Sequence, residues 1–283
     1  MISNINFYIS YGLNILSYFL FQWLSLPVFV AYRLIVTAYN LAWLFYNIHL
    51  YGANMFIYVT NWTYTILNIY FVFATTLSSI ALYKDLKKET ETITLATDEQ
   101  AVEIEMEPGN YGAVDQEHDD ASKKDALQCH HKLFWFIYVI AATGGLIITA
   151  GYWSVLAGDD PVDANNITKH ALNSVFMVID TSLSAIPVRL LHFLYVMLYF
   201  LIYLVFTVIY WLLGGTGYQG NTYIYKRLDY ENFRPINGGL VVIFLLLVLP
   251  FLHLSYLASP SYGIIFTGSI IKHEVTLRSN GLA

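Results

Sequence analysis

The chain has 283 residues, of which 57% are hydrophobic, 17% aromatic and only 12% charged. Soluble domains carry about 25% charged residues, so the composition excludes an ordinary soluble fold and makes the lipid bilayer the expected partner. The net charge of −6 gives no indication of a nucleic-acid partner. The single cysteine, Cys129, excludes an intrachain disulfide.

The N-terminal region, residues 1–27, is apolar but interrupted by polar residues and by Pro27. We interpret residues 8–26 as a helix that lies on the membrane surface. A membrane span is the competing interpretation, and it would reverse the topology given below. The first 32 residues carry no charge, so the basic start of a cleavable signal peptide is missing.

Six apolar segments follow, each about as long as the 17–25 residues that cross a bilayer core or slightly longer. They are residues 28–48, 55–83, 133–157, 169–186, 189–213 and 239–258. Pro250 is expected to kink the last of them. The sequence therefore predicts an all-α polytopic membrane protein, with helices 1–2 in residues 28–83, helices 3–6 in residues 133–258, and a tail, residues 259–283.

The segment 84–132 holds thirteen acidic residues and six lysines. It has too little apolar surface to form a core, so we expect a disordered loop. Ten of the 14 basic residues fall in this loop, at the adjoining ends of the spans and in the tail. The positive-inside rule then places this loop and both termini in the cytoplasm. The membrane itself, plasma membrane or endomembrane, stays open.

Polar residues interrupt the fourth segment at regular intervals. His170, Asn173, Asp180 and Ser184 follow at steps that keep them on one face of a helix. Ionisable groups inside a membrane face the protein interior and pair with a partner. Arg33, at the same expected depth as Asp180, is the candidate partner. We interpret Arg33–Asp180 as a structural ion pair, and an ion pathway as the minority alternative.

Thr60 and His170 fall near the same outer interface, within about 10 Å at 1.5 Å per residue. A neutral imidazole can take the proton of a threonine hydroxyl and activate it as a nucleophile. Asn173, one turn below His170, would orient the ring or donate to an oxyanion. Helix-packing roles for all three residues are the competing and more common interpretation.

Two further motifs have little predictive weight. Asn166 begins a glycosylation sequon on the expected outer side, but close to the membrane, so its use is doubtful. Residues 215–220, GTGYQG, match a dinucleotide fingerprint but lack the preceding strand that this motif needs. We predict no cofactor and no metal site.

Several separate motifs, in order, resemble those of the rolling stone family of membrane proteins. They are Gln22-Trp23, Tyr32–Val36, Phe56–Tyr64, His170–Val175, Ile186–His192, Tyr210–Gly215 and Tyr223–Tyr230. The resemblance runs from about residue 20 to residue 258 and is interrupted by the acidic loop. It implies a multi-pass membrane protein with a role in a membrane or cell-contact process such as myoblast or cell fusion.

A more distant likeness is to the androgen-induced membrane threonine hydrolases, which cleave fatty acid esters of hydroxy fatty acids. The likeness rests on two positions, Thr60 early in the second span and His170 at the start of the fourth. It implies that Thr60 is the nucleophile, that His170 is the base and that a lipid is the substrate. A fusion or adhesion role is thus the leading hypothesis, a lipid-ester hydrolase the alternative, and transport through Arg33 and Asp180 a third.

Overall fold

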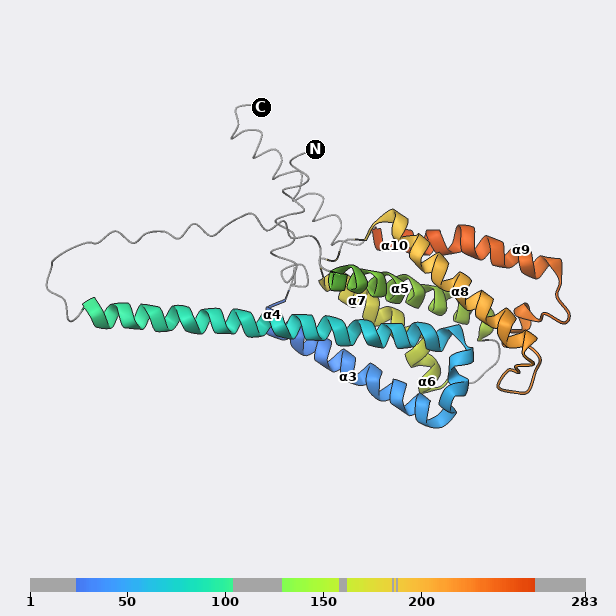
Figure 1. Cartoon of the computed structure of the whole chain (residues 1–283), viewed down its shortest axis with the longest axis horizontal. Coiled ribbons are helices and arrows are strands. Elements are labelled where there is room, and N and C mark those ends of the chain that lie inside the picture. The colour runs from blue at the N-terminus through green and yellow to red at the C-terminus, as the bar shows by residue number, and fades with distance from the viewer. Residues whose placement is uncertain (1–23, 104–128, 158–161, 185, 187, 258–283) are drawn as a thin grey trace, which may run out of the picture.

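The structure, a computed structural model, describes residues 24–103, 129–157, 162–184, 186 and 188–257. Within these ranges the chain forms helices and no strand, which confirms the predicted all-α fold. The helices run side by side along one axis (Figure 1). The expected surface helix 8–26 lies almost wholly outside the described residues, and the tail 259–283 lies entirely outside them.

The first two spans form a helical hairpin. Helix α3, Leu26–Tyr51, begins with Pro27 in its first turn, where a missing N–H costs nothing. Gly52 follows with a φ of 56°, a conformation that glycine adopts most easily, and starts the 3₁₀ turn η1, Gly52–Ile57. The chain then reverses into α4, which packs against both α3 and α5.

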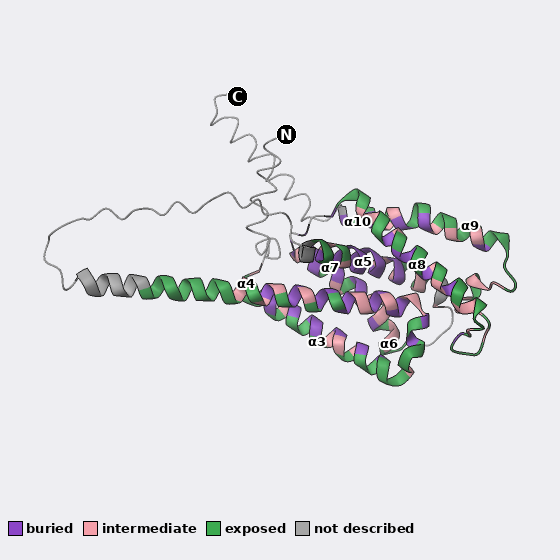
Figure 2. Cartoon of the chain, viewed as in Figure 1, coloured by how far each residue is buried: buried purple, intermediate pink, exposed green. Residues whose placement is uncertain are grey.

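Helix α4, Val59–Glu103, has 45 residues and is therefore roughly 67 Å long, about twice the thickness of a bilayer core. Its second half projects from the bundle, and the side chains of residues 83–94 are exposed there (Figure 2). Residues 84–103 were expected to be disordered and are helical instead. Lysine, glutamate and alanine favour helix without any core, and an already formed helix extends without a new nucleation cost.

The remaining helices complete a bundle around α5. Their bounds are α5 Cys129–Gly151, η2 Tyr152–Leu156, α6 Ala164–Ile167, η3 Thr168–Leu172, α7 Asn173–Leu183, η4 Leu190–His192, α8 Phe193–Leu212, η5 Lys226–Leu228, α9 Pro235–Ile243, η6 Phe244–Val248 and α10 Leu249–Leu257. Three of these, η2, η3 and η6, are π-helical turns, a widened geometry that is rare and concentrates at functional sites.

Five helices in the described ranges are long and apolar enough to cross a membrane, against six expected. They are Leu26–Ile57, Val59–Thr94, Lys132–Ser154, Leu190–Leu212 and Pro235–Tyr256. The missing one is the fourth, which runs without a break from Ala164 to Leu183. Its polar stripe lowers its hydropathy, and α7 packs against α5 inside the bundle.

The last helix changes geometry in its middle. The π-helical turn η6 ends two residues before Pro250, which has no N–H to donate, and a kink at Pro250 stays a prediction. Beyond this turn, α10 packs against α5 and α8. Before it, α9 buries only one residue, Asn237, and lies apart from the other helices (Figure 1).

The core lies where α4 and α5 meet α3 and α7 (Figure 2). Tyr70, Phe71 and Ala74 of α4 and Tyr138 of α5 are fully buried there. The outer helix faces carry exposed leucine, isoleucine, valine and phenylalanine side chains, the surface that a lipid-embedded bundle presents. This packing fixes two polar clusters inside the bundle.

Candidate functional site

The first cluster surrounds Arg33 and satisfies all of its donors. Its Nε lies 2.9 Å from Asp180 Oδ1, and its Nη2 lies 3.0 Å from Asp180 Oδ2. The remaining N–H groups donate to Ser184 Oγ at 2.9 Å, Ser78 Oγ at 2.6 Å and the Ala74 carbonyl at 3.2 Å. Arg33 and Asp180 are both 0% exposed, so the pair named from the sequence is present and fully buried.

This Arg33 cluster joins three helices. The Tyr70 hydroxyl of α4 donates to the same carboxylate from a third direction, and the guanidinium lies 4.2 Å from the centre of the Phe29 ring. Arg189 and His192, the other basic residues near this end of the bundle, contact Trp135. With every charge and donor paired, the cluster is suited to holding α3, α4 and α7 together.

The second cluster contains Thr60, near the start of α4. Tyr225, from the loop between α8 and α9, lines the same pocket and interacts with the Thr60 side chain. Tyr225 also neighbours Tyr203 of α8, whose hydroxyl donates to the Ile57 carbonyl at 2.7 Å. Burial raises the pKa of Tyr225 to about 12, so its phenol keeps its proton at neutral pH and can donate.

His170 is not hydrogen-bonded to Thr60 in the structure. Its ring stacks on Tyr152 with the centres 3.6 Å apart and the planes at 6°. Both rings lie in π-helical turns, η2 and η3. The Nδ1 atom of His170 is buried and has no hydrogen-bond partner among the described residues. The backbone carbonyl accepts from the Trp153 indole at 2.8 Å.

Asn173 is not hydrogen-bonded to Thr60 either. Its Oδ1 accepts from the Thr149 hydroxyl at 3.0 Å and from the Ser174 backbone N–H at 2.5 Å. It therefore ties α7 to α5, and the structure does not bring the three residues of the hydrolase hypothesis into one hydrogen-bonded triad.

Thr60 lines the largest of the described pockets, a cavity of about 620 Å³. Its walls come from the start of α4, the end of α5, the middle of α8 and the last helix. Most of the lining is apolar, including Ile147, Phe200 and Leu252. His170 is not part of the wall, but its stacking partner Tyr152 is. The pocket exists because α9 stands away from the bundle that α10 contacts.

Polar groups gather at one end of this pocket. The polar residues of the lining are Thr60, Tyr152, Ser154, Tyr203, Tyr225, Arg227 and Asn237. Of these seven, only Thr60 was named from the sequence. Asn237 carried a usable signal, because it is an amide at the start of an otherwise apolar helix. Tyr225 and Arg227 carried no such signal apart from belonging to a family motif. The conformation of their loop depends on the helices that it packs against, and the sequence does not show these contacts.

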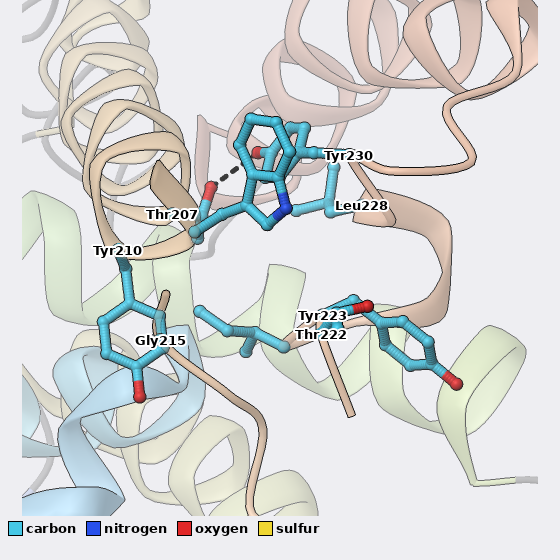
Figure 3. Close-up of a pocket in the computed structure, with 9 residues that line it drawn as sticks. Thr207, Tyr210, Gly215, Thr222, Tyr223, Leu228 and Tyr230 are labelled. Atoms are coloured by element: carbon cyan, nitrogen blue, oxygen red, sulfur yellow. Dashed lines mark hydrogen bonds between the residues drawn. The ribbon is translucent and has the colours of Figure 1, made fainter. Parts of the chain in front are cut away.

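Two other described pockets are less suited to a lipid. One, between α8 and the following loop, includes the contact of Thr207 and Tyr230, whose hydroxyls lie 2.7 Å apart (Figure 3). Its volume of about 10 Å³ is room for about one water molecule. The other, about 300 Å³, lies between Tyr58 and the loop residues Gly217–Ile224.

The predicted sequon lies at the start of the fourth helix. Asn166 is half-buried in α6, where its backbone N–H donates to Asp163 at 2.6 Å. The sequon's Thr168 is buried, with its hydroxyl 2.9 Å from that of Tyr39.

Comparisons with known proteins agree with these features. A family model described as "Protein rolling stone" matches residues 111–263, more than half of the chain. The protein called "Protein rolling stone" of Drosophila melanogaster is 39% identical over 121 residues, which are 41% of this chain and 44% of that protein. The chain thus matches less than half of that relative's length. No solved structure matches the chain. The family match extends over α5 to α10, which include Asp180 and most of the pocket lining but neither Arg33 nor Thr60, and the chain belongs to the rolling stone family.

Proposed function

We propose that this protein acts on a lipid of its own membrane, within a membrane or cell-contact process such as cell fusion. The pocket beside Thr60 carries the proposal. It has about 620 Å³ of space, apolar walls and a few polar groups at one end, which is the usual form of a site for a small amphiphilic molecule. The cell-contact context rests on membership of the rolling stone family alone.

Hydrolysis of a lipid ester is the second candidate, and the position of Thr60 in the pocket wall favours it. In that reaction the Thr60 oxygen attacks the ester carbonyl, its proton passes to a base, and the alcohol leaves with a proton. Water then cleaves the acyl-threonine and restores the hydroxyl. Tyr225, protonated and beside Thr60, is placed to donate to the developing oxyanion.

His170 is the candidate base and would have to leave its place against Tyr152. Tyr152 covers one face of the imidazole, and the buried Nδ1 atom has no hydrogen-bond partner among the described residues. A rotation of Tyr152 that admits a lipid would expose the imidazole to Thr60. This step makes Tyr152 a gate residue in the hydrolase candidate.

A fluorophosphonate probe tests the hydrolase candidate directly, because it traps activated hydroxyl nucleophiles. Membranes with wild type, Thr60→Ala and His170→Ala at matched expression would be labelled in parallel. Thr65→Ala is a matched control, since Thr65 lies on the same helix and its hydroxyl only donates to the Asn61 carbonyl. Loss of labelling in the first two variants alone is expected; no labelling of folded wild type rejects hydrolysis.

The cell-contact context needs its own measurement. Cells that express wild type or Thr60→Ala would be mixed with unmodified cells, and fusion or adhesion would be counted. If lipid chemistry at the pocket drives the process, the variant lowers the count at equal surface expression. An unchanged count would show that the cell-contact role does not depend on chemistry at Thr60.

A further inference from the structure

Two side chains at the polar end of the pocket lack protein partners. Asn237 is 8% exposed, lines the pocket, and its amide makes no hydrogen bond within the described part of the chain. Arg227 also lines the pocket, and no carboxylate of a described residue lies within ion-pair distance of it. We infer that Arg227 and Asn237 bind the anionic head group of an amphiphile whose acyl chain occupies the pocket.

Asn237 is the residue that most directly indicates a bound ligand. It is the only buried residue of α9, although Leu240, Val241 and Ile243 of the same helix also line the pocket. Its amide atoms are not among the fully enclosed unpaired polar atoms of the described residues, so they stay open to the pocket, and most buried amides find a hydrogen-bond partner. The head group of a bound molecule, or water in its absence, is the remaining source of a partner, because the pocket is where the side chain points.

Arg227 is the reason to expect a negatively charged head group. The nearest acidic residues in its loop are engaged elsewhere: Asp229 accepts from the backbone of Glu231 and Asn232, and Glu231 accepts from Thr222. The guanidinium is therefore free to pair with a ligand, and its planar fork suits a carboxylate or a phosphate. An amide donor beside it adds a hydrogen bond to the same oxygens.

The apolar part of the pocket indicates the shape of the bound amphiphile. From Asn237 to Leu252 the lining follows the last helix for about 22 Å at 1.5 Å per residue. Val241, Phe244 and Val248 form an apolar wall along that path. One acyl chain fits such a path, with its head group at the end where α9 begins. This inference rests on the proposed lipid pocket and adds a charge preference to it.

Equilibrium binding to purified full-length protein in neutral phosphatidylcholine nanodiscs tests the inference. Three radiolabelled probes share one oleoyl chain: oleate, oleoyl lysophosphatidate and monooleoylglycerol. Wild type is expected to bind at least one anionic probe about tenfold more tightly than the neutral one. Arg227→Gln removes that preference and leaves monooleoylglycerol binding unchanged, and Asn237→Leu weakens the anionic probes several-fold.

Lys226→Gln is the matched control, because Lys226 adjoins Arg227 but does not line the pocket. Equal affinity of wild type for all three probes, or an Arg227→Gln variant that behaves like Lys226→Gln, overturns the charge preference while the lipid pocket stands. Failure of all three probes to bind overturns the lipid pocket as well. The ratio of oleate to lysophosphatidate affinity separates carboxylate from phosphate head groups.

Discussion

Arg33 carries a charge that lies fully buried between three helices. Such a charge strongly destabilises the fold if it loses its counterion. Asp180→Leu would leave that charge without its counterion, and we expect a loss of about 3–5 kcal/mol in the free energy of unfolding. Arg33→Met leaves the carboxylate unpaired and should cost a similar amount. Unfolding in mixed micelles with a denaturing detergent measures both.

The double variant Arg33→Met, Asp180→Leu distinguishes a pair from two independent residues. Replacing both charges with apolar groups removes the burial cost together with the attraction, so the double variant should be less destabilised than the sum of the two single variants. Additive losses would show that the residues stabilise the fold separately. The Ser184 hydroxyl would lose both of its partners and set a residual cost, whereas the Ser78 hydroxyl keeps its hydrogen bond to the Ala74 carbonyl.

Tyr70 and Tyr138 offer a matched comparison at the same depth. Both are fully buried, but Tyr70 donates to the Asp180 carboxylate and Tyr138 to the Thr181 hydroxyl at 3.1 Å. Hydrogen bonds to charged groups are worth about 1.5–3 kcal/mol and neutral ones about 0.5–1.5 kcal/mol. Tyr70→Phe should therefore lower the unfolding free energy more than Tyr138→Phe, and equal losses would contradict a charge-assisted bond.

At the scale of elements, the contact between α4 and α5 depends on a glycine. A Cβ atom at Gly144 would lie 3.1 Å from Thr63 Cγ2, whereas one at Gly151 of the same helix meets nothing within 4 Å. Gly144→Val should force the helices apart and cost about 1–3 kcal/mol. Gly151→Val carries the same change in helix propensity without the clash, so thermal unfolding of the two variants in detergent isolates the packing effect.

The sequence was most informative where burial left one physical solution. Two ionisable residues inside apolar spans can be stabilised only by pairing, and Arg33 and Asp180 are paired. Thr60 and His170 show what spacing cannot decide. Their positions along the helices determine their depth in the membrane. What each side chain contacts depends on how α4 and α6–α7 are oriented against α5. Thr60 faces the pocket, and His170 stacks on Tyr152.

Elements that depend on tertiary placement were missed for the same reason. The site residues Tyr225 and Arg227 belong to a loop whose position follows from the packing of α8 and α9. The helical extension to Glu103 was missed because lack of apolar surface excludes a core but does not exclude a helix. The fourth helix was predicted as an apolar segment, residues 169–186, and it runs from Ala164 to Leu183, although its polar stripe lowers its hydropathy.

For the whole molecule, the two ends of the bundle predict which loops share a side of the membrane. The turn η1 and the loop between α8 and α9 lie at one end, and the long projection of α4 extends from the other (Figure 1). The excess of basic residues near the α4 projection predicts that this end is cytoplasmic. Exposed positions at each end, Lys87 and Gln219, can report the side.

Single cysteines at these positions, Lys87→Cys and Gln219→Cys, would be introduced into a Cys129→Ser background, which removes the only native thiol. In sealed microsomes the cytoplasmic face points outward. A membrane-impermeant maleimide should therefore label Lys87→Cys at once and Gln219→Cys only after detergent opens the vesicles. The reverse pattern would put the charged α4 projection in the lumen. Because Arg227 lies in the same loop as Gln219, the result also decides from which side the polar end of the lipid pocket is reached.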